Sequence, residues 1–135
     1  MPLRTRTPWW GVVLDAPDVS ALTDFYQRLL GWQVFNRSAT WAALAPSEDA
    51  GYYIGIQHEP LYVRPVWPAT EGHQQISMHL DIEVEDLASA VEYAISVGAE
   101  LAQYQPQDTV RVMLDPVGHP FCLYLDPDTV ERAAP

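Results

Sequence analysis

The residues best able to do chemistry lie on one face of a short alternating segment, residues 74–84. Its polar residues occur at every second position, with His79 at the centre. This period of two is typical of a β-strand with one polar and one apolar face. A neutral histidine there can accept or donate a proton near neutral pH, so His79 is the candidate catalytic residue. Two other interpretations stay open: a hydrogen bond to Asp81 or Ser77, or ligation of a metal ion.

The single cysteine, Cys122, is the second residue with chemical potential. It is open to three interpretations: a small apolar residue, a nucleophile activated by a nearby base, or a thiolate ligand of a soft metal. A lone cysteine cannot form an internal disulfide, so we expect a reducing, cytoplasmic location.

Composition excludes several classes of function. All seven basic residues are arginine, which excludes a Schiff-base lysine and a P-loop lysine. The formal net charge of −11 predicts no nucleic-acid partner and no anionic membrane partner. We find no G-x-G-x-x-G, H-E-x-x-H or C-x-x-C motif, no apolar leader and no run long enough to span a membrane.

The expected elements fall into two similar series. Each begins with a strand, continues through an aspartate cap into an amphipathic helix that a glycine ends, and closes with three more strands. In the first series the cap is Asp18 and the helix ends at Gly31; the strands are Trp9–Asp15, Trp32–Asn36, Thr40–Ala45 and Tyr52–His58. In the second the helix covers 86–97 and ends at Gly98; the strands are 74–84, Ala99–Gln103, Val110–Leu114 and Phe121–Leu125, with a tight turn at 115–120.

The two series are an internal repeat, offset by 68 residues before the helix and by 67 after it. The repeat predicts an α+β protein of two paired βαβββ modules. We divide this single domain into module 1 (9–58), a proline-rich linker (59–73), module 2 (74–125) and a loose tail (126–135).

Several motifs carry a resemblance to a known family. They are Leu14-Asp-Ala-Pro-Asp18, Phe25-Tyr26 with Leu29-Leu30-Gly31-Trp32, Trp67-Pro68, His79-Leu80-Asp81, and Asp115-Pro116 with Gly118-His119-Pro120-Phe121. With them the chain resembles the vicinal-oxygen-chelate superfamily, in particular glyoxalase-like domains of the glyoxalase/bleomycin resistance/dioxygenase type. The resemblance implies a curled, eight-stranded mixed sheet with helices on its convex side and the ligand in the concave cup. It also implies a homodimer.

Strand alternation and the repeat together assign side chains to the cup. The predicted lining is Trp9, Gly11, Val13, Tyr53, Gly55, Gln57, Ser77, His79, Asp81, Arg111, Met113, Cys122 and Tyr124. Arg111 suggests an anionic ligand group, with a salt bridge to Asp81 or Glu83 as the alternative. Trp67 in the linker is a candidate lid, cup-wall or dimer-interface residue, whereas Trp10 and Trp32 are expected in the core. The predicted ligand-binding residues are His79, Gln57, Arg111, Tyr124, Tyr53, Trp9, Trp67 and Cys122.

The resemblance also implies four metal-ligand positions, which here hold Gly11, Gly55, His79 and Cys122. Glycine offers no ligand, and two side chains are fewer than the three that a catalytic zinc normally takes. We therefore expect no metal or other cofactor, with His79 and Cys122 as weak metal candidates. The expected function is binding of a small aromatic or anionic molecule. The alternatives are a divalent-metal-dependent lyase, isomerase or dioxygenase-type enzyme that adds Gln57 or Asp81 to this pair, and a non-catalytic dimeric accessory protein.

Overall fold

The computed structural model describes residues 2–128, which form two compact units divided between Tyr62 and Val63. Each unit holds one helix and one four-stranded mixed sheet, which confirms the predicted α+β fold of two strand–helix–strand–strand–strand modules. The division falls inside the connection predicted at 59–73. Most of the predicted tail, residues 129–135, lies outside the described residues.

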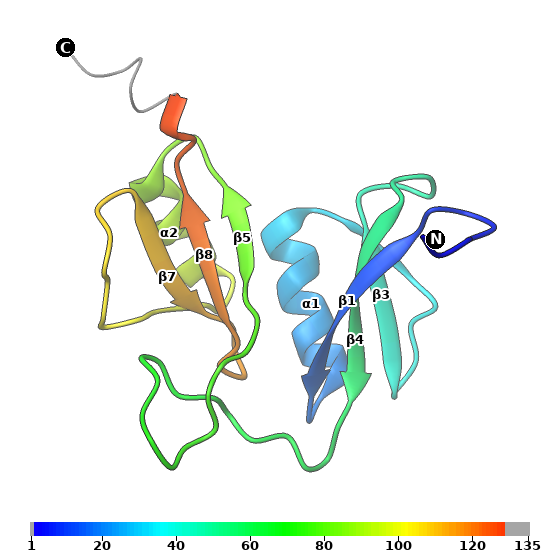
Figure 1. Ribbon diagram of the computed structural model, residues 1–135, viewed down its shortest axis with the longest axis horizontal. Coiled ribbons are helices and arrows are strands. Elements are labelled where there is room, and N and C mark those ends of the chain that lie inside the picture. The colour runs from blue at the N-terminus through cyan, green and yellow to red at the C-terminus, as the bar shows by residue number, and fades with distance from the viewer. Residues whose placement is uncertain (1, 129–135) are drawn as a thin grey trace. The chain divides into compact units, whose positions relative to one another are not determined.

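The N-terminal unit builds its sheet in the order β1-β4-β3-β2 (Figure 1). Strand β1 runs parallel to β4, and the remaining neighbours are antiparallel. Because parallel neighbours need a crossover, α1 lies between β1 and the rest of the sheet in the chain. The elements are β1 (Trp10–Ala16), α1 (Val19–Leu30), β2 (Gln33–Phe35), β3 (Trp41–Ala45) and β4 (Tyr52–His58).

Helix α1 begins and ends where the sequence predicts. Asp18 accepts a hydrogen bond from the Ala21 N–H at 3.1 Å, and Gly31 ends the helix in the left-handed conformation, with φ of 71°. The helix buries Val19, Leu22, Phe25 and Tyr26. It packs on the sheet face that carries Ala42, Leu44, Ile54 and Ile56, and each large side chain buried there contributes about 1.5–3 kcal/mol.

The C-terminal unit repeats this topology with the strand order β5-β8-β7-β6. Strand β5 runs parallel to β8, just as β1 does to β4. Its elements are β5 (Leu80–Glu83), α2 (Leu87–Ser96), β6 (Glu100–Leu101), β7 (Val110–Leu114) and β8 (Pro120–Tyr124). In the part of the chain that is described, neither helix has the length and apolar run that a membrane span requires.

The turn between β7 and β8 is organised by Asp115, which is only 1% exposed. Its Oδ1 accepts hydrogen bonds from the N–H groups of Val117 and His119, both at 3.0 Å. Its Oδ2 lies 2.6 Å from Nδ1 of His119. The buried carboxylate is thus satisfied within the turn, which fits the interpretation of His119 as a turn residue.

Two expectations about these elements are wrong. Of the strand predicted over 74–84, only Leu80–Glu83 forms β5. Its partner β8 begins at Pro120, and the pairing starts at Leu80 with Phe121. Met78, expected on the inward face of that strand, is 73% exposed. Trp10, expected in the core, is 63% exposed, and its ring lies 6.3 Å from that of Tyr52. Trp10 is the first residue of β1. Its neighbour Tyr52 also contacts the Trp32 ring, so these three rings form a cluster outside the core that α1 covers.

Candidate functional site

The face of the N-terminal sheet turned away from α1 carries the predicted lining of this module. Paired residues on neighbouring strands share a face, and the register pairs Gly11 with Tyr53 and Val13 with Gly55. The next pair is Asp15 with Gln57, whose amide Nε2 donates to Asp15 Oδ1 at 3.3 Å. Alternation therefore assigned Tyr53 and Gln57 to one face of one unit correctly.

Two glycines on this face are covered by aromatic rings. A Cβ on Gly11 would overlap Cζ, Cε1 and Cε2 of the Tyr53 ring, so the phenol lies across the backbone of β1. A Cβ on Gly55 would overlap Cη2 of Trp41. The space that a side chain would need at both positions is already filled by a ring, which is a known use of glycine in strands.

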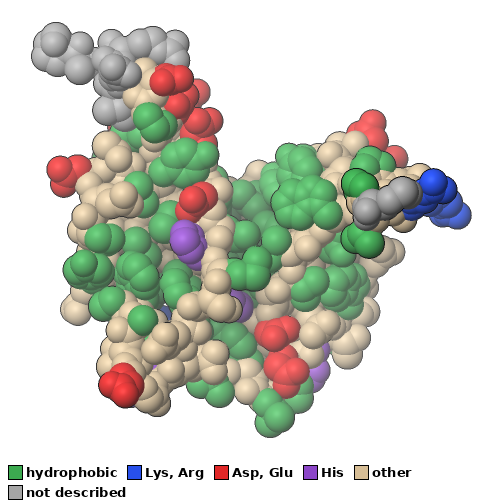
Figure 2. Space-filling model, viewed as in Figure 1, with side chains coloured by type: hydrophobic (Ala, Val, Ile, Leu, Met, Phe, Trp, Pro, Cys, Tyr) green, Lys and Arg blue, Asp and Glu red, His purple; other side chains and the backbone are tan. Residues whose placement is uncertain are grey.

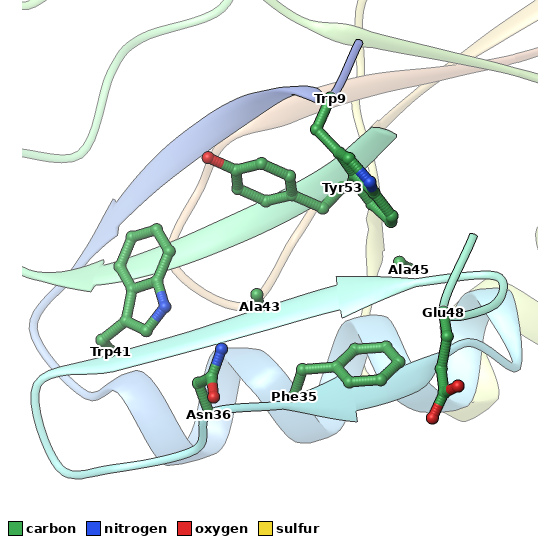
Figure 3. A pocket seen from close by; sticks show the side chains of 8 residues that line it. All are labelled: Trp9, Phe35, Asn36, Trp41, Ala43, Ala45, Glu48 and Tyr53. Carbon is green, nitrogen blue, oxygen red and sulfur yellow. The ribbon is translucent and has the colours of Figure 1, made fainter. Parts of the chain in front are cut away.

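The rings border an open pocket of about 510 Å³ (Figure 3). Its volume is within the range of about 300–1,000 Å³ that is usual for small-molecule sites. Figure 3 shows the labelled side chains on the near side of the sheet, with α1 behind it. The lining residues are Trp9, Phe35, Asn36, Trp41, Ala43, Ala45, Glu48 and Tyr53.

Sequence reasoning missed the half of this pocket that β2 and β3 supply. Trp41 pairs with Gln57, and Ala43 pairs with both Gly55 and Phe35, so these residues must share the face of the pocket. The alternation Trp41-Ala-Ala-Leu-Ala45 was visible, but it does not reveal which phase faces the pocket. The signal that could have found them was the antiparallel pairing of two strands joined by a short loop.

A second cluster lies in the C-terminal unit, where Asp81 on β5 pairs with Cys122 on β8. The ligand atoms of His79, Asp81 and Cys122 all lie within 4.8 Å of one another. Nε2 of His79 is 3.2 Å from Oδ1 of Asp81, and both side chains are substantially exposed. The structure thus supports the interpretation of His79 as a partner of Asp81, and it brings Cys122 to the same place.

Burial raises the pKa of the Cys122 thiol, and the negative charge of Asp81 and a hydrogen bond to it raise this pKa further. At neutral pH the sulfur is therefore protonated and is a weak nucleophile. This environment is the reverse of the positive field that activates a catalytic cysteine.

The residues of this cluster fit a divalent metal ion in kind and number. Imidazole nitrogen, carboxylate oxygen and thiolate sulfur are all zinc ligands, and three protein ligands suffice for a catalytic zinc. An ion would have to displace the thiol proton of Cys122. The carboxylate of Asp81 would then offset part of the positive charge of the metal instead of accepting a hydrogen bond from the thiol. Asp81 completes the set, whereas Gln57, the other candidate for this role, donates to Asp15 in the N-terminal unit.

The face predicted for Arg111 and Met113 is wrong. The register pairs Arg111 with Leu123 and Met113 with Phe121, and the two latter side chains are in the core. Arg111 therefore shares the face opposite to Asp81 and Cys122, which excludes the alternative salt bridge to Asp81. Its Nη1 donates to the carbonyls of Gln107, Asp108 and Val110 at 2.8–3.3 Å. These bonds close the loop before β7.

Trp67 and Tyr124 lie in the C-terminal unit, and their predicted roles in ligand binding stay predictions. The indole N–H of Trp67 donates to the Tyr104 carbonyl at 3.3 Å, and the two rings lie 6.1 Å apart. Arg64, three residues earlier, reaches Glu100 at 3.1 Å. The linker is thereby attached to its own unit from Arg64 onward. Tyr124 pairs with Glu83 and shares the face of Cys122.

Comparison with known proteins identifies the family of the chain. The sequence model described as "Glyoxalase-like domain" matches residues 11–124. None of the curated proteins matches the sequence.

Three solved structures illustrate how widely this fold is shared. A glyoxalase/bleomycin resistance protein/dioxygenase family enzyme from Burkholderia phytofirmans is 22% identical, with a TM-score of 0.63, over 85% of this chain and 95% of that one. A glyoxalase-related enzyme from Fulvimarina pelagi is 19% identical, with a TM-score of 0.64, over 93% and 90%. The fosfomycin resistance protein FosX from Mesorhizobium loti is 11% identical, with a TM-score of 0.62, over 92% and 96%. At these identities the likeness concerns the fold alone.

Proposed function

Because this chain belongs to the glyoxalase-like domain family, we propose that it binds a small, planar aromatic molecule in the pocket of its N-terminal unit, without a standard metal site. The observation that carries the proposal is that aromatic rings cover the two glycines of the open sheet face and border the pocket. The fold is one that includes small-molecule binding proteins, and one structural neighbour is a fosfomycin resistance protein.

The chemistry of the lining supports a flat, apolar ligand. Four aromatic side chains, Trp9, Phe35, Trp41 and Tyr53, surround the floor formed by Ala43 and Ala45. Each favourable ring–ring contact contributes about 0.5–1.5 kcal/mol beyond the burial of apolar area. Small alanines between large rings leave room for a planar molecule to stack.

The same two glycines argue against a standard metal site. Family metal positions fall on Gly11 and Gly55, and the rings of Tyr53 and Trp41 occupy the space that a ligating side chain there would need. A substituted ligand residue would have to displace a ring before it could reach an ion. The N-terminal module therefore uses for stacking the positions that would otherwise supply ligands.

A thermal-shift and fluorescence titration with neutral bicyclic aromatic compounds tests the proposal. Ligand that binds only the native state must raise the melting temperature, and stacking on the pocket tryptophans should quench their emission. We expect both effects in the wild type and in Trp10→Leu, which removes an exposed indole outside the pocket. Both effects should be strongly reduced in Trp41→Leu. A panel that moves neither signal would favour a non-catalytic accessory protein.

A divalent-metal enzyme is the second candidate function, because Asp81 brings the ligand set to three. The residues that would hold the ion are His79, Asp81 and Cys122, and the ion would supply Lewis-acid chemistry at this place. Metal analysis after dialysis against zinc distinguishes the candidates. One tightly bound equivalent per chain that His79→Ala and Asp81→Asn both abolish would favour the enzyme, and a substoichiometric content would favour the metal-independent binder.

We further propose a homodimer in a reducing compartment. Strand β1 lies at one end of its sheet, where it can pair with another strand, and the exposed Trp10 on β1 offers apolar area to a partner. Light scattering on the purified chain and on Trp10→Arg measures the oligomeric state directly. The expected masses are those of a dimer for the wild type and of a monomer for the variant.

A further inference from the structure

The charges around the aromatic pocket define the electrostatic class of its ligand. Among the eight described residues that line the pocket, Glu48 carries the only formal charge, and it lies at one end of the pocket (Figure 3). Asn36 is the only other polar side chain among these eight apart from the indole and phenol groups. On the same sheet face, Asp15 adds a carboxylate that interacts with Gln57. None of the eight offers a positive charge to an anion.

The arginine nearest to the pocket in sequence is turned away from it. Arg37 follows Asn36 directly, yet its Nη2 donates to Asp24 Oδ1 at 2.7 Å and to Ser20 Oγ at 2.9 Å, both on α1. It is thus bound to the helix, on the opposite side of the sheet from the pocket. An anionic ligand would therefore meet Glu48 with no compensating guanidinium from Arg37 or from the eight lining residues.

The aromatic rings add negative potential of their own. The faces of indole and phenol rings are electron-rich, and a cation within about 6 Å of a ring centroid is attracted to them. Tyr53 and Trp41 lie against the glycines, and both side chains also line the pocket, where a ligand can contact them. The formal net charge of −11 attracts cations at longer range. Figure 2 shows acidic side chains scattered over the face in view.

We propose that the pocket selects a cationic aromatic molecule, one whose ring stacks on the aromatic side chains that line the pocket while its ammonium group lies against the ring faces and Glu48. This inference rests on the proposed function, since it names the charge of the ligand for the same pocket. It replaces the expectation of an anionic ligand, because that depended on Arg111, which the register assigns to the core face.

Three probes of equal ring size test the selection by isothermal titration calorimetry: 2-naphthylmethylammonium, 2-naphthalenemethanol and 2-naphthoate. The ammonium compound should bind about tenfold more tightly than the alcohol, a ratio within the range of cation–π interactions. Its advantage should shrink at high salt, which screens exposed charges. The carboxylate should bind most weakly.

Two variants assign the effect to the pocket. Glu48→Gln should lower the affinity for the ammonium probe about threefold and leave that for the alcohol unchanged, since it removes only the charge. Glu92→Gln changes the net charge equally on α2, in the other unit, and should alter neither affinity.

The outcomes separate the two proposals. If the alcohol or the carboxylate binds as tightly as the ammonium probe, the selection of a cation is overturned while the aromatic pocket stands. If none of the three binds, the proposed function fails and the inference fails with it. Equal losses of ammonium affinity in Glu48→Gln and Glu92→Gln would assign the preference to net charge instead of the pocket and would also overturn the inference.

Discussion

The phenol ring of Tyr53 lies across Gly11, where the Cβ of any other residue would overlap it. The two residues are paired on parallel strands β4 and β1, so the ring bends sideways over its partner strand instead of standing upright on the sheet. Trp41 stands in a similar relationship to Gly55. The aromatic rings can thus lie over the open face of this sheet because two of its positions are glycines without side chains.

Gly55→Ala tests whether a glycine is required under the indole. The added methyl group would overlap Cη2 of Trp41, and overpacking of this kind destabilises proteins by about 1–3 kcal/mol. In a Trp41→Leu background the same substitution should be neutral or stabilising by about 0.5–1 kcal/mol, because alanine in a strand is preferred over glycine. Chemical denaturation of the wild type, the two single variants and the double variant gives the coupling energy. Additive effects would show that the ring does not depend on the glycine.

The environment of Cys122 predicts slow reaction with thiol reagents. Burial and Asp81 raise its pKa above the ordinary value of 9.0, so little thiolate is present at neutral pH. Disulfide exchange with an aromatic disulfide reagent should be slower in the native protein than in the denatured chain. Asp81→Asn removes the negative charge and should increase the native rate. A native rate that equals the denatured one, or a decrease in Asp81→Asn, would contradict this account of the thiol.

The cap of α2 predicts a specific loss of stability in acid. Hydrogen bonds from the backbone N–H and side chain of Ser89 lower the pKa of Asp86 below its ordinary value of 3.8. A carboxyl group whose pKa is lowered in the folded state stabilises it above pH 3.8, and this contribution disappears as the pH falls through the lowered pKa. Asp86→Asn keeps a capping oxygen but does not titrate.

Urea denaturation of Asp86→Asn and wild type, from neutral pH to below 3.8, measures this contribution. The wild type should be the more stable at neutral pH, and the difference should narrow in acid. A difference that stays constant across this range would mean that the capping carboxylate makes no charge-dependent contribution.

The sequence was sufficient for features that depend on local signals. Asp18, Gly31 and Asp86 each carry a cap chemistry that fixes a helix end, and the internal repeat predicted the second module from the first. The family resemblance is likewise confirmed by the match over residues 11–124. Alternation was also reliable for Tyr53 and Gln57, because β4 runs without interruption from Tyr52 to His58.

Features that depend on strand register were not predictable in this way. Whether Arg111 faces a ligand or the core is decided by its pairing with Leu123, and nothing in Val110–Leu114 alone selects between the two phases. The same holds for Trp41, which enters the pocket because it pairs with Gln57. The strand predicted at 74–84 is shortened because its partner begins only at Pro120. A shift of one residue in the register exchanges the two faces of a strand, and the composition of the strand alone does little to prevent such a shift.

The indole N–H signals in a ¹H–¹⁵N spectrum test the central claim most directly, because the five tryptophans give separate reporters across both units. Titration with 2-naphthalenemethanol in the presence of a chelator should shift the signals of Trp9 and Trp41, which line the pocket. The signal of Trp67, whose indole donates to Tyr104, should stay in place. Shifts confined to Trp67, or shifts that the chelator abolishes, would contradict an aromatic, metal-independent pocket in the N-terminal unit.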